Sequence, residues 1–287
     1  EQAETFGANA TTLKHLLARA LVAGTQAHEL GKAINYGEAG SLFTNAMLYS
    51  LGDLILALCR SDAAKQLEAI RLEDPTNVAK AELALLGRPL HIIAAAMARH
   101  WNLPESLVQL LEKKPVWPKT RPEADQRIME SIVRAANELS YCLLNPSATG
   151  QEEIFQGLLK QFLPPFGLSF IQLEHTVSRA FMQASEIASA INIDRQHFLP
   201  ASGPEHALIH HQQLHQLTQT IHQALHAEGS SPTEYAEPAQ KKSLGIQPSH
   251  TSGRLLLDFT LQAMNISEPS KLLTFAARTL YASYGFE

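Results

Sequence analysis

Residues 39–59 read AGSLFTNAMLYSLGDLILALC, and this stretch decides the fold class. Its apolar residues recur at spacings of three and four and cover most of the circumference of a helix. A helix that is apolar nearly all round must be surrounded by other elements. We therefore expect one central helix over 39–59, with Met47, Leu51 and Leu54 buried.

The same period continues on both sides of this stretch. We expect helices over 12–34, from 61, from 75 to 87, from 89 to 101, from 104 to 113, and over 123–144, 152–162, 169–193 and 205–228. Asp74-Pro75 is typical of a helix start, Gly87 of a helix end, and Ser169 with Gln172 of a capping box. No segment before Pro200 alternates as a strand does. The sequence predicts an all-α, multi-helix bundle.

Composition excludes several classes of protein. The chain has 287 residues, of which 45% are hydrophobic and 18% charged, so it can build a core. The net charge of −5 gives no support for nucleic-acid binding. The longest uninterrupted apolar run, Ile92 to Ala98, is too short to cross a membrane, and the first residues show no signal peptide. Cys59 and Cys142 lie in apolar runs and are expected to be buried thiols, which suits a reducing, cytoplasmic location.

The character of the chain changes near residue 200. We expect a helical domain over 1–200, then a polar helix and a Ser- and Pro-rich linker over 201–253, and two further helices over 254–287 that open a second domain. The chain begins with Glu and stops within this second domain, so we expect it to be a piece of a longer protein.

Three segments carry a resemblance to a known family. They are Ala46-Met47-Leu48-Tyr49-Ser50-Leu51-Gly52, then Glu82, Gly87 and His91 followed by Trp101-Asn102-Leu103-Pro104, and then residues 132–139 with their Ala-Asn-Glu-Leu pattern. Residues 6–193 thereby resemble HDOD domains, relatives of the His-Asp metal phosphohydrolases. More weakly, residues 255–286 look like the leading helices of a GAF-type sensor domain.

The departures from the family pattern indicate loss of catalysis. The resemblance implies an adjacent His-Asp pair where this chain has Tyr49-Ser50, and an upstream His where it has Ala18-Arg19-Ala20. Neither Tyr nor Ser is a reasonable ligand for a divalent ion at neutral pH. Asp53 lies three residues beyond the lost Asp and is expected to point elsewhere on the helix. We therefore predict no catalytic residue, metal or cofactor, and a vestigial site consisting of Tyr49, Ser50 and His91.

The segment 205–228 has two features. His211, His215, His222 and His226 share one side of the expected helix, and pairs at this spacing can chelate a metal, although no third ligand converges on them. Leu214, Leu217, Ile221 and Leu225 form a narrow apolar stripe that must pack on the body or on a second copy. We expect this helix to couple domains, with a homodimer through 205–228.

These observations favour a non-catalytic signal-transduction module in a bacterial regulator, with other signalling proteins or domains as partners and neither nucleic acid nor membrane. Two alternatives stay open. One is a metal-dependent phosphohydrolase of nucleotides or cyclic dinucleotides, and the other is a module that binds a nucleotide without turnover.

Overall fold

The computed structural model describes residues 2–113, 117–145, 151–190 and 212–227, and every element in these ranges is a helix, without any strand. The all-α prediction is confirmed. The elements are α1 (Gln2–Ala33), α2 (Ala39–Tyr49), α3 (Leu51–Cys59), α4 (Ser61–Glu73), the 3-10 turn η1 (Pro75–Asn77), α5 (Val78–Leu86), α6 (Leu90–His100), α7 (Glu105–Glu112), α8 (Asp125–Leu144), α9 (Gln151–Gln161), α10 (Leu163–Phe166), α11 (Phe170–Ala190) and α12 (Gln212–Ala227).

Local signals set the helix ends as predicted. The Asp74 carboxylate accepts a hydrogen bond from the Thr76 amide at 3.2 Å, ahead of η1. Gly87 ends α5 with φ 73°, a left-handed conformation that favours glycine. Ser169 and Gln172 bond each other's backbone amides before α11, which is the predicted capping box. Pro164 and Pro165 lie in the first turn of the short helix α10, where a missing backbone N–H costs no hydrogen bond.

The expected single helix over 39–59 is two helices, and this is a correction. Ser50 separates α2 from α3, with φ −83° and ψ 8°. Just after this break α3 packs closely on α6, because a Cβ at Gly52 would lie 2.9 Å from Leu90 Cγ. Leu51 is buried as predicted, whereas Met47 and Leu54 are only half-buried. The lack of a side chain at Gly52 allows α6 to lie this close to α3.

Residues 39–59 are long and apolar enough to span a membrane, with a mean hydropathy of 1.5. Helices α5 and α6 would also be so if they were taken together as one span despite the bend between them. Half of the 39–59 window is buried inside the bundle. Core helices of soluble proteins satisfy the same test, so this is weak evidence for a membrane segment.

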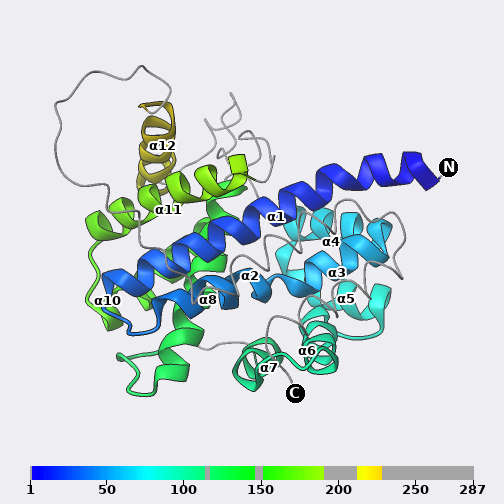
Figure 1. Cartoon of the computed structure of the whole chain (residues 1–287), viewed down its shortest axis with the longest axis horizontal. Helices are drawn as coiled ribbons and strands as arrows, with labels where there is room; N and C mark the ends of the chain where they lie inside the picture. The colour runs from blue at the N-terminus through cyan, green and yellow to red at the C-terminus, as the bar shows by residue number, and fades with distance from the viewer. Residues whose placement is uncertain (1, 114–116, 146–150, 191–211, 228–287) are drawn as a thin grey trace.

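The main core lies around α1, which runs along α2, α8 and α11 (Figure 1). Small residues on α1 let its neighbours approach closely: Ala18, Ala23 and Ala27 are fully buried, and a Cβ on Gly31 would collide with Leu42 of α2. The largest fully buried side chains of the main core include Phe155, Phe162, Phe181, Leu30, Leu42, Ile132 and Leu139. Cys142 is buried in this core as predicted, but Cys59 is exposed, because it ends α3 at the rim of the bundle.

A second, smaller group of buried side chains lies under α3, α4 and α6. This side cluster consists of Leu56, Ala63, Leu67 and Leu90, with half-buried residues of α5 packed against it. All nine residues of α5 are described and none is buried. The side cluster is therefore thin beside the main core.

Helix α12 packs on α11 of the same chain (Figure 1). Leu217, Ile221 and Leu225 are buried there, so the described part of the apolar stripe is covered within one chain. Any self-association through 205–228 must therefore use other residues of that segment. Residues 205–211 and 228, and the expected helices over 254–287, lie outside the described residues.

Candidate functional site

A cavity of about 630 Å³ lies where α1, the α2–α3 junction, α4, α8 and α9 meet. We call it the central cavity. The residues that line it are Arg19, Tyr49, Ser50, Asp53, Arg71, Trp117, Arg134, Asn137, Glu138, Tyr141, Ile154, Gly157 and Gln161. Tyr49 and Ser50 of the predicted vestigial site are thus brought together in its wall. His91, the third member, is half-buried on α6 and is not among the lining residues.

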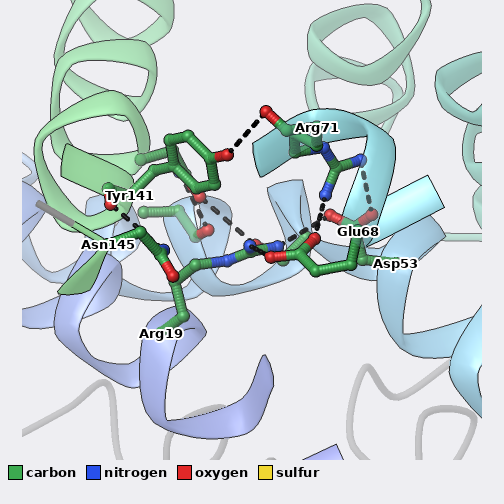
Figure 2. Close-up of polar contacts among 9 residues, drawn as sticks. Arg19, Asp53, Glu68, Arg71, Tyr141 and Asn145 are labelled. Carbon is green, nitrogen blue, oxygen red and sulfur yellow. Dashed lines mark hydrogen bonds and ion pairs between the residues drawn. The ribbon is translucent and has the colours of Figure 1, made fainter. Parts of the chain in front are cut away.

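Four charged side chains from three helices form one network at the edge of this cavity. Arg19 Nη2 and Arg71 Nη2 bind the two oxygens of Asp53 at 3.0 and 3.1 Å. Arg71 Nη1 also binds Glu68 at 2.9 Å, and Arg19 Nη1 lies 3.5 Å from the other Glu68 oxygen. Figure 2 shows both guanidinium groups converging on the two carboxylates. This guanidinium–carboxylate network joins α1, α3 and α4.

The placement of Asp53 corrects the expectation that it points away from the site. Asp53 lines the central cavity together with Tyr49 and Ser50. The expectation was wrong because residues three apart on a helix lie only about 60° apart around its axis, so residue 53 shares a face with residue 50. Asp53, in the first turn of α3, therefore reaches the same cavity wall as Ser50.

The network fixes the charge of its members. Burial alone would raise the pKa of Asp53, but the charges of Arg71 and Arg19 and the Arg71 hydrogen bond together hold this pKa below its usual range. The charge of Asp53 in turn raises the pKa of Arg71, against the opposing effect of burial. Asp53 is therefore an anion held between two cations at neutral pH.

A second charged pair lies on the α8 side of the cavity. Arg134 Nε binds Glu138 at 2.7 Å, and the Arg134 guanidinium lies 4.1 Å from the centre of the Trp117 ring. Burial raises the pKa of Glu138, although the charge of Arg134 opposes this shift. Ser50 Oγ donates to Asn137 Oδ1 at 3.3 Å, which ties the α2–α3 junction to α8.

Both tyrosines of the cavity are protonated at neutral pH. Burial raises the pKa of Tyr141 to about 12, and the Tyr141 hydroxyl donates to the Arg71 carbonyl at 3.3 Å (Figure 2). Burial, followed by the charge of Glu138, also raises the pKa of Tyr49. A protonated phenol is a hydrogen-bond donor and a poor metal ligand.

The donor set of the cavity does not fit the metal centre that the family resemblance implies. Asp53 and Glu138 are each bound to arginine, and three guanidinium groups line the same space. Within the described residues, no group of three or more His, Cys, Asp or Glu side chains is placed to hold a metal ion. Carboxylates that are already paired in this way do not provide a site for a divalent cation.

The other candidates from the sequence lie away from this cavity. His211 falls outside the described residues, and His215 and His226 lie on α12 but their side chains are not described. His222 is half-buried on α12 and does not line the central cavity. The histidine pairs of 205–228 therefore stay a prediction.

Sequence reasoning missed the network and the Arg134–Trp117 contact. The sequence does indicate that Arg19 is buried, because it lies between alanines on the apolar side of its helix. In the structure it is only 6% exposed. A charged residue in such a position needs a partner of opposite charge. The identity of that partner is set by the tertiary structure, because Asp53 is 34 residues away along the chain.

Comparison with known proteins bears on the first half of the chain. The family model of the HDOD domain matches residues 2–115, which span α1 to α7. No curated protein and no solved structure matches the chain. The GAF-like resemblance falls on residues outside the described part and is not supported by a match. Arg19, Tyr49, Ser50, Asp53 and Arg71 lie inside the matched range, so the HDOD resemblance covers one wall of the central cavity.

Proposed function

We propose that the chain is a non-catalytic, HD-like module that serves signal transduction through contacts with other protein domains. The observation that carries this proposal is the position of Arg19. Arg19 stands in the stretch Ala18-Arg19-Ala20, where the resemblance implies an upstream metal-binding His, and it binds Asp53 at 3.0 Å. A carboxylate that is already neutralised by a guanidinium supports the proposal that no metal is used here.

The phosphohydrolase alternative is less well supported. Such an enzyme needs a metal to generate hydroxide and to stabilise the phosphate charge. Three arginines at the cavity repel a divalent cation, and the carboxylates they bind are not free to coordinate it.

The signalling part of the proposal rests on the packing of α12. This helix buries its apolar residues on α11, and α11 packs along α1, which carries Arg19. Contacts thus run from the segment 205–228 to the cavity wall. We propose that residues 1–200 form the module, 201–253 couple it to a second domain that begins at 254, and the whole works in the bacterial cytoplasm.

Loss of catalysis is tested by metal content and by hydrolysis of bis(p-nitrophenyl) phosphate with added Mn²⁺, Fe²⁺ or Zn²⁺. The wild-type chain should carry no stoichiometric metal and release no nitrophenolate. The triple variant Arg19→His/Tyr49→His/Ser50→Asp, which restores the ligand types of the family, should bind metal in the same assay. Metal-dependent hydrolysis by the wild type would contradict the proposal.

Partner contact is tested by photo-crosslinking in cells. A photoreactive residue replaces exposed Gln223 on α12, and a matched one replaces exposed Glu105 on α7. We expect a discrete adduct from position 223 and none from 105. An adduct of twice the chain's mass would identify the partner as a second copy, and equal adducts from both positions would contradict a role for α12.

The cavity itself favours a second candidate, a module that binds a ligand without turnover.

A further inference from the structure

We infer that the central cavity binds a small, uncharged aromatic molecule, which makes its polar contact with the Tyr49 hydroxyl. This inference rests on the proposed loss of catalysis, because a metal ion held for hydrolysis would add positive charge to the same space.

The charged groups around the cavity balance one another. Three cations and three anions are joined there in ion pairs: Arg19, Arg71, Arg134, Asp53, Glu68 and Glu138. All of them except Glu68 line the cavity. An ion that entered would lose its water without meeting an unpaired opposite charge, which is unfavourable. An uncharged molecule avoids this loss.

Three uncharged polar side chains of the wall already use their donors within the protein. Ser50 Oγ donates to Asn137 Oδ1, and the Asn137 amide donates to two backbone carbonyls at 2.9 and 3.2 Å. The Tyr141 hydroxyl donates to the Arg71 carbonyl. Tyr49 differs from these, because its hydroxyl has no hydrogen-bond partner in the described part of the chain.

The Tyr49 hydroxyl lies among groups that line the cavity. Burial raises the pKa of this hydroxyl, and the charges of three lining residues, Glu138, Arg134 and Asp53, also act on it. The phenol is protonated at neutral pH, so it can donate one hydrogen bond and accept another. A hydroxyl or N–H group on a ligand would supply the partner that the protein does not.

Aromatic and aliphatic side chains supply the rest of the wall. The residues of this kind are Tyr49, Trp117, Tyr141 and Ile154. The Trp117 ring packs on the Phe162 ring, with 6.0 Å between the ring centres, and on the Arg134 guanidinium. Rings in such a wall favour an aromatic ligand, because ring pairs are stabilised beyond the burial of their area. The volume of about 630 Å³ lies within the usual range of about 300 to 1,000 Å³ for ligand sites.

The α9 side leaves room for the ring system. Gly157 lines the cavity, and a Cβ built there would meet only Gln161 Nε2, at 4.0 Å. A larger side chain at 157 would therefore fill the cavity without displacing its neighbours. This makes Gly157→Leu a blocking variant that is expected to fold.

The experiment compares probes that share one naphthalene ring and differ in charge: naphthalenemethanol, naphthoate and naphthylmethylammonium. Their binding to the full chain is measured by calorimetry at neutral pH. We expect naphthalenemethanol to bind with a Kd below about 1 mM, and both ions to bind at least about tenfold more weakly. Octanol, an uncharged alcohol without a ring, should bind at least about threefold more weakly than naphthalenemethanol.

Three variants test the contacts. Gly157→Leu should weaken the binding of naphthalenemethanol by at least about tenfold, because leucine occupies the space of the ring. Tyr49→Phe, which removes only a hydroxyl, should weaken it by about threefold to tenfold. Glu138→Gln removes one negative charge and leaves a positive surplus, so it should improve the binding of naphthoate relative to naphthalenemethanol by at least about threefold.

Gly40→Leu is the matched control. Gly40 is also a helical glycine with no neighbour within 4 Å of its Cβ position, and it lies on α2 away from the central cavity. This variant should bind naphthalenemethanol as the wild type does, and circular dichroism should show that all variants are folded.

Several results would overturn the inference. They are either ion or octanol binding as tightly as naphthalenemethanol, binding unchanged in Gly157→Leu or in Tyr49→Phe, no gain for naphthoate in Glu138→Gln, and no binding of any probe at about 5 mM.

Hydrolysis of bis(p-nitrophenyl) phosphate by the same preparation, with Mn²⁺ added, separates this inference from the proposed function. Hydrolysis would overturn the loss of catalysis, whereas absence of probe binding without hydrolysis would overturn only the ligand.

Discussion

The main core and the side cluster hold their helices in different ways. In the main core, α1, α2, α8 and α11 bury large side chains such as Phe181 and Leu139 completely. In the side cluster only four residues are buried, and α5 buries none of its own. Apolar packing alone therefore attaches α4 and α5 weakly.

The guanidinium–carboxylate network lies between these two regions. Arg19 belongs to α1 in the main core, whereas Asp53, Glu68 and Arg71 belong to α3 and α4 beside the side cluster. Tyr141 of α8 adds a hydrogen bond to the Arg71 carbonyl. The comparison teaches that charged side chains connect the two regions at the place where apolar packing is thin.

The largest effect should come from truncation in the main core. Leu139→Ala removes a fully buried side chain, and the free energy of unfolding should fall by about 3–5 kcal/mol. Leu67→Ala in the side cluster should cost less, about 2 kcal/mol, because thin packing leaves the cavity free to collapse. Urea unfolding of both variants measures the difference. Equal losses would mean that the side cluster is packed as tightly as the main core.

Removal of the central carboxylate should have the next largest effect. Asp53→Asn leaves Arg19 and Arg71 without their shared anion, and breaking a buried ion pair on one side typically costs about 3–5 kcal/mol. Because the Asp53 side chain is 22% exposed, we expect about 2–3 kcal/mol here. Urea unfolding at neutral pH checks this value.

The same variant has a pH signature. The folded-state pKa of Asp53 lies below its unfolded value, so the network stabilises the fold above the unfolded pKa. This stability is lost as pH falls through the folded-state pKa. The difference between wild type and Asp53→Asn should therefore stay constant at neutral pH, begin to shrink below about pH 5, and keep shrinking toward about pH 3 and below. A constant difference over this range would show that the charge of Asp53 is not what stabilises the junction.

These residues also show what the sequence can and cannot predict. Helix existence and caps were predictable because Asp74, Gly87 and the Ser169–Gln172 box act on their own neighbours. The break at Ser50 was not predictable, because the apolar pattern continues through it. The resemblance selected Tyr49, Ser50 and His91, and of these the structure places Tyr49 and Ser50, but not His91, at the central cavity. The guanidinium–carboxylate network was not predictable, since no spacing rule links Arg19 to residues on α3 and α4.

The smallest effect should come from an ion pair far from the junction. Arg99 and Glu112 form a pair at 2.8 Å between α6 and α7, with side chains 53% and 35% exposed. Exposed pairs contribute about 0–1 kcal/mol because water screens the charges and the side chains lose freedom, so Glu112→Gln should change the free energy of unfolding by no more than this. Both this variant and Asp53→Asn replace a carboxylate by its amide, so they differ mainly in the surroundings of the pair. High salt provides the second comparison, since it should weaken the Arg99–Glu112 pair more than the partly buried Asp53 network. An equal loss of unfolding free energy in Glu112→Gln and Asp53→Asn would mean that burial does not strengthen the Asp53 ion pairs. In that case interactions other than the network would attach α3 and α4 to α1.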